Sequence, residues 1–351
     1  MTLSKNKVIV GMSGGVDSAV TAYLLQKEGY EVIGATLRTW EGESSRCCEI
    51  DKARNSAFKL GIKYYPWNVT DAFREYVTEP FVKEYLQGRT PNPCVECNPK
   101  VKWAGLLHIA DTLGAEYVAT GHYASIVKLE NGRFSVKKGF DEKKDQSYML
   151  YRLTQEQLSR TLLPLGDMKK TDVKETAQKE NLVSENQKES QEICFVTEGS
   201  YADYLEKEAG KLPIGNFIDE SGNILGKHNG IARYTVGQRK GLGVAMGHPV
   251  YVKAILPETN EVILSEDDAL YVDEIYCNRL NAMGVSDFKI SLSHISVKIR
   301  YHHSGTYADM SYADDDTLRI SFEEPVRAPT PGQSAVFYDE DGCVLGGGII
   351  K

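Results

Sequence analysis

The chain has 351 residues, of which 41% are hydrophobic and 26% are charged, and its formal net charge is −8. This length suits about two or three globular domains. No stretch approaches the roughly 20 apolar residues that cross a bilayer, and the first residues lack the apolar core of a signal peptide. We therefore expect a cytoplasmic protein with no membrane partner. The acidic total excludes a protein that is basic throughout, so any nucleic-acid binding must come from a local surface.

Strand and helix patterns alternate over about the first 125 residues. A strand rich in Val and Ile is expected over Lys7–Met12, followed by a glycine turn and a helix over Val16–Glu28. Further strands are predicted over Glu31–Leu37, Lys63–Val69 and Glu116–Thr120, with helices over Asp51–Leu60, Asp71–Gln87 and Lys102–Leu113. Strands that alternate with helices favour a doubly wound α/β domain with a parallel sheet.

The pattern changes after this region. A hairpin is predicted around Asn131-Gly132, and 154–182 is expected to be mostly helical. From about Gly210 short strands alternate with turn sequences, which is typical of small β-barrels. We therefore expect three domains, an N-terminal α/β domain over 1–209, a central β domain over 210–270 and a C-terminal β-barrel over 271–351.

A glycine-rich turn lies between the first strand and the first helix. Backbone N–H groups there can approach an anion, and the helix N-terminus adds its positive dipole end. Asp17 would lie beside an anion bound in this turn, and if that anion is a phosphate, the acidic residue suggests that Mg²⁺ is bound as well. The chain has no Gly-x-x-x-x-Gly-Lys-Ser/Thr sequence, so this turn is not a Walker loop. The turn consists of Gly11, Met12, Ser13, Gly14, Gly15, Val16, Asp17 and Ser18.

The string Ser-Gly-Gly-Val-Asp-Ser in this turn resembles the loop of the adenylating PP-loop ATPases. The resemblance implies that ATP is cleaved to AMP and pyrophosphate while a substrate carbonyl oxygen is adenylated. Leu37 and Gly121, at the ends of the second and fourth predicted strands, would then lie at the sheet edge that receives adenine.

Two cysteine segments indicate the chemistry that comes after adenylation. The chain has seven cysteines and no secretory signal, so paired cysteines point to redox chemistry or a metal rather than to a disulfide framework. Cys97 lies in a proline-containing segment, 89–98, that is expected to be an extended loop between helices. Cys194 lies about 100 residues further on. Persulfide chemistry needs one thiol to carry a sulfane sulfur and a second to release it by exchange.

These segments closely resemble the bacterial tRNA-specific 2-thiouridylase (MnmA) family, over nearly the whole chain. The match includes the ATP loop and residues 119–123, 144–148, 234–243 and 345–348. The resemblance implies that the C2 oxygen of the wobble uridine is adenylated and then replaced by sulfur, in tRNAs for Lys, Glu and Gln. By the same resemblance Cys194 would carry the persulfide and Cys97 would attack it, leaving a Cys97–Cys194 disulfide.

The resemblance also implies a set of residues that touch the tRNA, and it implies a persulfide donor protein as a second partner. We expect a monomer, since nothing in the sequence marks an oligomer interface. The residues implied to contact the tRNA are Asn92, Pro93, Cys94, His122, Lys144, Asp145, Gln146, Arg300, Tyr301 and Gln333.

One position departs from the family pattern and leaves a second mechanism open. Many family members have Asp where this chain has Cys94. Cys94, Cys97 and Cys194 could together hold a [4Fe–4S] cluster with one open iron, to which sulfur would come as hydrosulfide. Two further alternatives are an ATP-dependent nitrogen ligase of the same superfamily and a non-catalytic binding protein. The adjacent Cys47-Cys48 pair is interpreted as a packing or surface feature.

Overall fold

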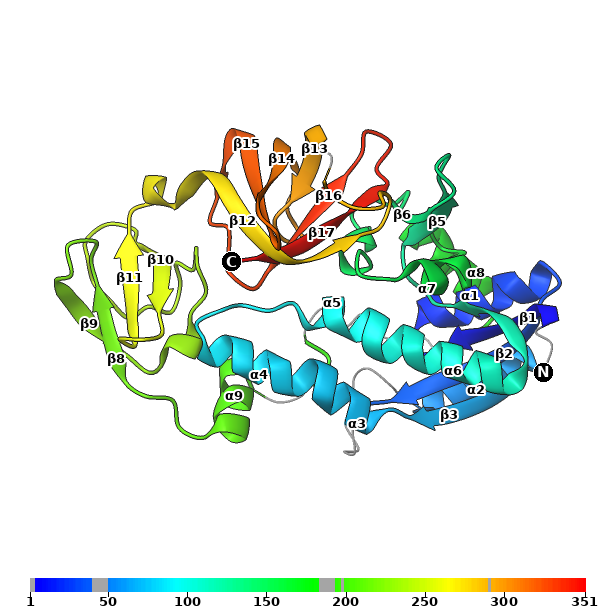
Figure 1. Ribbon diagram of the computed structural model, residues 1–351. Helices are drawn as coiled ribbons and strands as arrows, with labels where there is room; N and C mark the ends of the chain where they lie inside the picture. The colour runs from blue at the N-terminus through cyan, green and yellow to red at the C-terminus, as the bar shows by residue number, and fades with distance from the viewer. Residues whose placement is uncertain (1–3, 40–49, 183–192, 197–198, 290–291) are drawn as a thin grey trace. The chain divides into compact units, whose positions relative to one another are not determined.

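The computed structural model describes residues 4–39, 50–182, 193–196, 199–289 and 292–351 (Figure 1). These residues form two compact units. Unit 1 consists of the described residues within Met1–Val77, Cys94–Thr197 and Asp341–Leu345. Unit 2 consists of those within Thr78–Pro93, Glu198–Glu340 and Gly346–Lys351. Cys47 and Cys48 lie outside the described residues. No helix in the described part of the chain is long and apolar enough to span a membrane.

Unit 1 is built on a five-stranded sheet in the order β3-β2-β1-β4-β7, and all its strand pairs are parallel. The chain runs outward from β1 to β3 and then returns to β4 on the other side of β1. The predicted doubly wound α/β fold is therefore confirmed. The strands are β1 (Ser4–Gly11), β2 (Glu31–Arg38), β3 (Lys63–Asn68), β4 (Ala115–Ala119) and β7 (Thr161–Leu162).

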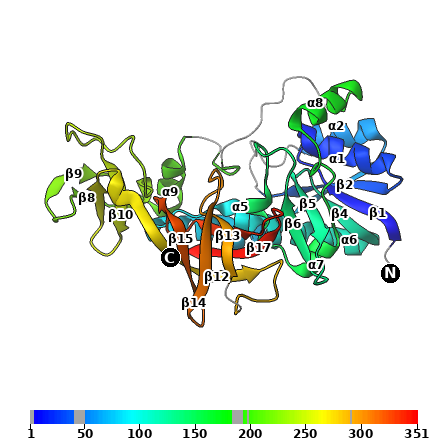
Figure 2. The ribbon, with the colours of Figure 1, turned by 90° about the horizontal axis from the view of Figure 1, so that it is seen from above.

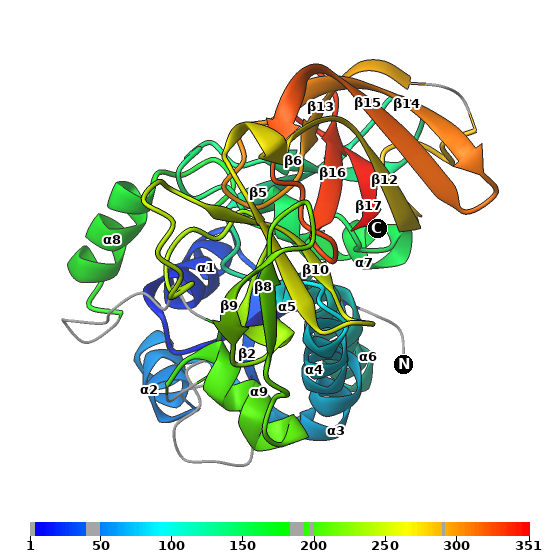
Figure 3. The same cartoon turned by 90° about the vertical axis from the view of Figure 1, so that its left-hand side faces the viewer.

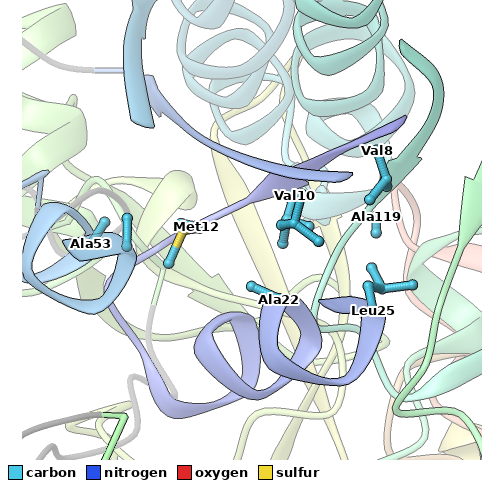
Figure 4. Close-up of a cluster of buried hydrophobic side chains, with 9 residues drawn as sticks. Val8, Val10, Met12, Ala22, Leu25, Ala53 and Ala119 are labelled. Carbon is cyan, nitrogen blue, oxygen red and sulfur yellow. The ribbon is translucent and has the colours of Figure 1, made fainter. Parts of the chain in front are cut away.

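Helices cover both faces of this sheet (Figure 2). Val8 and Val10 of β1 point to one face, where they pack with residues of α1 (Val16–Lys27) and α2 (Ile50–Leu60) (Figure 4). The opposite face is covered by α6 (Ala104–Leu113), whose Leu106 lies against Gly11 at the end of β1. The alternation of side chains along a strand thus gives β1 two buried faces, as its unbroken apolar sequence predicts.

Two helical segments differ from the prediction. The helix expected over Asp71–Gln87 is α3 (Thr70–Phe73), a π-helix η1 (Arg74–Thr78) and α4 (Glu79–Leu86) in succession. The prediction of an extended loop over 89–98 is wrong from residue 93 onward. A helix, α5 (Pro93–Cys97), begins there, and it continues through the π-helix η2 (Asn98–Trp103) into α6. Proline is favoured at the first position of a helix, where its missing N–H would have no partner.

The rest of unit 1 follows the sequence expectations in outline. The hairpin strands β5 (Ala124–Lys128) and β6 (Phe134–Lys138) pair antiparallel around the Asn131-Gly132 turn. The stretch 154–182 contains α7 (Gln155–Ser159) and α8 (Lys170–Lys179), but the edge strand β7 lies between them. The short 3₁₀-helix η3 spans Ser147–Met149.

The described residues of unit 2 form two β structures, the α-helices α4 and α9 (Tyr201–Ala209), and the short 3₁₀-helices η4 (Ile231–Arg233) and η5 (Asp268–Leu270). A closed antiparallel barrel has the strand order β12-β15-β14-β13-β16-β17, and a separate four-stranded sheet has the order β10-β11-β8-β9. Helix α4 packs against α9 (Figure 3). The sheet strands are β8 (Gly215–Ile218), β9 (Ile224–His228), β10 (Tyr251–Leu256) and β11 (Glu261–Ser265). The barrel strands are β12 (Tyr271–Ala282), β13 (Leu292–Lys298), β14 (Thr306–Asp314), β15 (Thr317–Arg327), β16 (Ser334–Tyr338) and β17 (Val344–Ile350).

Candidate nucleotide and sulfur-transfer site

The glycine turn lies at the carboxyl ends of the parallel strands, between β1 and α1. Met12 fixes its start, because its N–H donates to Ala35 O at 2.8 Å and its carbonyl accepts from Thr36 Oγ1 at 2.6 Å. Gly14 has φ 80°. Gly15, the N-cap of α1, offers no side chain to cap the helix. The first N–H groups of α1 therefore face the turn without a capping side chain, which is the usual arrangement of an anion site.

Two hydroxyl groups shape the same turn from within. Ser18 Oγ accepts from the N–H of Ser13 at 3.2 Å and donates to Gly15 O at 3.1 Å. The N–H of Gly15 points to Ser13 Oγ at 3.4 Å. The hydrogen bonds draw the loop over the helix end, so that a bound phosphate would meet backbone N–H groups and hydroxyls together.

Asp17, in the first turn of α1, is held by two residues from distant parts of unit 1. Lys170 Nζ donates to both carboxylate oxygens, at 2.6 and 2.7 Å, and Tyr123 Oη donates to Oδ1 at 2.7 Å. Lys170 is the first residue of α8 and is only 8% exposed. Sequence reasoning missed this lysine, since no motif surrounds it and it lies 153 residues from Asp17. It brings a buried cation to the edge of the glycine turn.

Gly121, the second residue after the end of β4, approaches the start of α1 very closely. A Cβ atom on this residue would lie 2.9 Å from the carbonyl carbon and from Cβ of Asp17, and 3.0 Å from the backbone nitrogen of Ser18. The predicted position of Gly121 at the nucleotide edge of the sheet thus has a steric reason, because any side chain would push α1 and its turn away. Leu37, the other residue expected near adenine, is buried in β2 and lies against Gly105 of α6.

Replacing Gly121 by alanine should therefore displace the N-terminus of α1. We expect a fall in thermal stability that corresponds to about 1–3 kcal/mol, as for other overpacked sites, together with weaker ATP binding. Calorimetry and equilibrium binding of a non-hydrolysable ATP analogue would measure both. Unchanged nucleotide affinity in a folded variant would show that the turn tolerates the displacement.

His122 follows Gly121 and contacts Thr120 and Trp103. Its Nδ1 is 2.7 Å from Thr120 Oγ1, and its ring lies 5.5 Å from that of Trp103, centroid to centroid. Burial, with the charge of Lys102 as a smaller cause, lowers the pKa of His122 to about 3. The imidazole is therefore neutral at physiological pH and can offer hydrogen bonds to a base without adding charge.

This pKa has a consequence for stability at mildly acidic pH. An unfolded histidine takes up a proton near pH 6.5, whereas folded His122 does so only near pH 3, so stability is lost as the pH falls below 6.5. Between pH 6.5 and 5.5 the wild type should lose about 1 kcal/mol more than a His122→Asn variant. Denaturant unfolding at the two pH values measures this difference, and NMR titration of the ring should show no protonation down to pH 5. A ring that titrates near pH 6.5 would contradict both expectations.

Cys97 ends α5 and lies in a segment that unit 1 holds firmly. Cys97 is 5% exposed and directly precedes the π-helix η2. Asn98 Nδ2 donates to Met149 O at 2.8 Å, and Gln157 Nε2 donates to Pro99 O at 2.8 Å. Cys94 is one helical turn earlier and half-buried. The two cysteines thus share a helix face, and π-helical turns of this kind occur often at functional sites.

Cys194 lies in a short turn, Ile193–Val196, that packs toward the same region of unit 1. The ring of Phe195 meets that of Phe73 edge to face, with centroids 5.8 Å apart. Phe73 ends α3, and α3 contacts the π-helix η2 that follows Cys97. Cys194 is itself half-buried. These contacts connect the turn that carries Cys194 to the helical segment that follows Cys97, by way of α3.

A [4Fe–4S] cluster is not supported by these positions. Within the described ranges no three Cys, His, Asp or Glu side chains lie close enough together to hold a metal ion. Cys94, Cys97 and Cys194 are all described residues, and in this arrangement they do not fit a cluster. We therefore derive no step through one.

The residues implied to contact tRNA fall in both units, and several make contacts within their own unit. Asp145 is buried and accepts hydrogen bonds from the N–H groups of Gly139 and Ser147, both at 3.0 Å. Gln146 binds the backbone of Tyr123. These contacts give Asp145 and Gln146 structural roles, while Lys144 is half-exposed. In unit 2, Arg300 donates a hydrogen bond to Arg327 O, and the ring of Tyr301 packs on that of His302. Gln333 donates a hydrogen bond to Thr90 O. Asn92 and Pro93 are half-buried.

The chain matches three family models in succession. These describe a tRNA methyl transferase HUP domain over 6–198, a tRNA methyl transferase PRC-barrel domain over 202–266 and an aminomethyltransferase beta-barrel domain over 272–350.

Among curated proteins, the chain is 50% identical to "tRNA-specific 2-thiouridylase MnmA" of Lachnoclostridium phytofermentans, over 98% of this chain and 99% of the relative. It is 46% identical to "tRNA-specific 2-thiouridylase MnmA 2" of Clostridium tetani over 100% of both chains. A relative in Clostridium botulinum, "tRNA-specific 2-thiouridylase MnmA", is 44% identical over 100% of this chain and 99% of its own length. Together with the parallel sheet and its glycine turn, this full-length similarity shows that the chain belongs to the MnmA family of tRNA-specific 2-thiouridylases, within the PP-loop superfamily.

Proposed function

We propose that this protein is a tRNA-uridine 2-sulfurtransferase. It uses ATP to adenylate the C2 oxygen of the wobble uridine and replaces that oxygen by sulfur, giving 2-thiouridine, AMP and pyrophosphate. The observation that carries the proposal is the presence in one unit of the glycine turn at the end of β1 and of two cysteine segments that are connected through α3. The names of the full-length relatives support the same reaction.

The glycine turn and Lys170 would carry out the first step. Backbone N–H groups of Gly14 and Gly15 and the end of α1 would bind the phosphates. The C2 oxygen attacks the α-phosphorus, the bond to the β-phosphate breaks, and pyrophosphate leaves. Lys170, beside Asp17, would stabilise the negative charge that develops on the phosphates. Leu37 and Gly121 would border the adenine.

Mg²⁺ fits this site through Asp17. The ion usually binds proteins through one or two carboxylates and takes its other ligands from phosphates and water. Asp17 offers such a carboxylate at the mouth of the turn, although it is paired with Lys170 here. Bound Mg²⁺ would neutralise charge on the leaving pyrophosphate.

The two cysteines would carry out the second step. The terminal sulfur of a Cys194 persulfide attacks C2 of the adenylated uridine. Cys97 thiolate then attacks Sγ of Cys194, and the electron pair of the broken S–S bond forms the C2=S bond as AMP leaves with the former C2 oxygen. The products are 2-thiouridine and a Cys97–Cys194 disulfide. A thiol reductant and a persulfide donor protein must restore the enzyme for the next turnover.

The remaining assignments concern the RNA. We propose tRNAs for Lys, Glu and Gln as substrates, with the base extruded toward Asn92, Pro93 and Cys94. His122 and Lys144 would contact the RNA in unit 1, and Arg300 and Tyr301 in unit 2. We propose that the domain boundaries lie after residues 209 and 270. We also propose that the enzyme acts as a monomer.

The direct test is to incubate the protein with ATP, Mg²⁺, unmodified tRNA and a persulfide source, and to assay AMP and 2-thiouridine. The proposal predicts that both form in equal amounts. A nitrogen ligase would yield AMP without 2-thiouridine, and a binding protein would yield neither, so either outcome would refute it.

A further inference from the structure

The barrel turn Pro331–Gln333 holds the chain just before the cysteine-bearing helix α5. The N–H of Thr90 donates to Pro331 O at 2.8 Å, and Gln333 Nε2 donates to Thr90 O at 2.7 Å. Both backbone polar groups of Thr90 are therefore bound by the turn. Its hydroxyl is in addition 3.2 Å from Thr235 Oγ1. All these residues belong to unit 2.

The turn fits this segment only because its central residue is glycine. Gly332 has φ +93°, a conformation that favours glycine. A Cβ atom here would lie 2.9 Å from the backbone nitrogen of Thr90 and 3.1 Å from Cβ of Arg89. The turn is itself tied to the end of β17, because Gly332 N–H donates to Ile350 O at 3.0 Å and Ile350 N–H donates to Gln333 O at 2.9 Å. The barrel thus presents a fixed surface to residues 89–90.

Arg89 attaches the same segment a second time. Its guanidinium donates to Ile350 O at 3.0 Å and to Glu84 Oε2 at 2.6 Å. The other oxygen of Glu84 accepts from Arg279 of β12 at 2.6 Å. Glu84 is largely buried, with 13% of its side chain exposed. The end of α4, the barrel and residues 89–90 are therefore joined by one network of charged groups.

The position of this attachment along the chain suggests its purpose. Asn92 follows Thr90 by two residues and Cys94 by four, so Cys94 lies within about 14 Å of the attached residue even in a fully extended chain. Pro91 and Pro93 restrict the backbone between them. A fixed Thr90 therefore limits where Asn92 and Cys94 can lie.

We propose that Gly332 and Gln333 form a positioning clamp that fixes, through Thr90, the segment Asn92–Cys94 against the target base. Gln333 is then a positioning residue that acts through Thr90. This inference rests on the proposed function, which supplies the base. It gives the C-terminal barrel a part in the reaction beyond holding the RNA.

The test uses the full-length enzyme and three variants. Gln333→Met removes the donor at similar volume. Gly332→Ala drives a methyl group against Thr90. Gly222→Ala is the control, because Gly222 also has positive φ, +85°, but has no atom within 4 Å of the added Cβ. The measurements are kcat at saturating tRNA, the tRNA Kd, and hydrogen exchange of a peptide that covers 88–94.

A clamp predicts that kcat falls about tenfold in Gln333→Met and about 10²-fold in Gly332→Ala, with a tRNA Kd within about twofold of the wild type. The peptide 88–94 should exchange faster in both variants, and Gly222→Ala should match the wild type. Unchanged kcat, or a higher Kd as the main effect of Gln333→Met, would overturn the clamp. A wild type that makes no 2-thiouridine would refute the proposed function instead, and exchange in 88–94 would still decide whether the clamp exists.

Discussion

Cys194→Ser and Cys97→Ser enzymes are each expected to lose 2-thiouridine formation by at least about 10³-fold, as when other catalytic nucleophiles are removed. Serine cannot carry a sulfane sulfur, and it cannot release one by thiol exchange. Both variants should still release pyrophosphate from ATP when tRNA is present, because the glycine turn and Lys170 are untouched. Product analysis by mass spectrometry and a pyrophosphate assay measure the two steps separately.

The matched control for these variants is Cys277→Ala. Cys277 is fully buried in β12, and burial raises the pKa of its thiol well above the usual range, so it is unreactive. This variant should form 2-thiouridine at close to the wild-type rate per folded molecule. Full thiolation by either Cys97→Ser or Cys194→Ser would show that sulfur reaches the base by another route.

Lys170→Met should slow adenylation by about 10²–10³-fold, the range seen when one preorganised electrostatic group is removed from an active site. The lysine is the buried cation beside the turn, and its two bonds to Asp17 fix its position. Release of pyrophosphate under single-turnover conditions measures the effect. Lys169→Met is the matched control, because Lys169 is adjacent but exposed, with its ammonium over the ring of Phe140.

A double variant separates a catalytic role from a structural one. If Lys170 only neutralised Asp17, replacing both by neutral residues, Lys170→Met with Asp17→Asn, would restore activity by removing the unpaired charge of Asp17. The proposed roles predict that the double variant stays as inactive as Lys170→Met alone. Recovery of pyrophosphate release in the double variant would contradict them.

The parts of this site that the sequence predicts are those encoded by neighbouring residues. The strand, glycine turn and helix over β1 and α1 follow from hydrophobic pattern and turn chemistry within about 25 residues, and the structure agrees closely. The approach of Gly121 to Asp17 is predicted only in outline, from the ends of parallel strands meeting at one edge.

The parts that the sequence does not predict depend on packing between distant segments. The ion pair of Lys170 with Asp17 joins residues 153 apart, and the bond of Gln333 to Thr90 joins residues 243 apart. Neither the lysine nor the glutamine carries a local signal for such a partner. The helix at Cys97 escapes prediction for another reason, because proline usually interrupts a helix, whereas Pro93 starts α5.

The most direct test of the proposed reaction traces the uridine oxygen itself. In tRNA labelled with ¹⁸O at C2 of the wobble uridine, single-turnover thiolation should transfer the label to the phosphate of AMP, because the C2 oxygen attacks the α-phosphorus and leaves with it. We predict one labelled AMP for each 2-thiouridine formed. Unlabelled AMP, with the label in water or pyrophosphate, would contradict adenylation of the base.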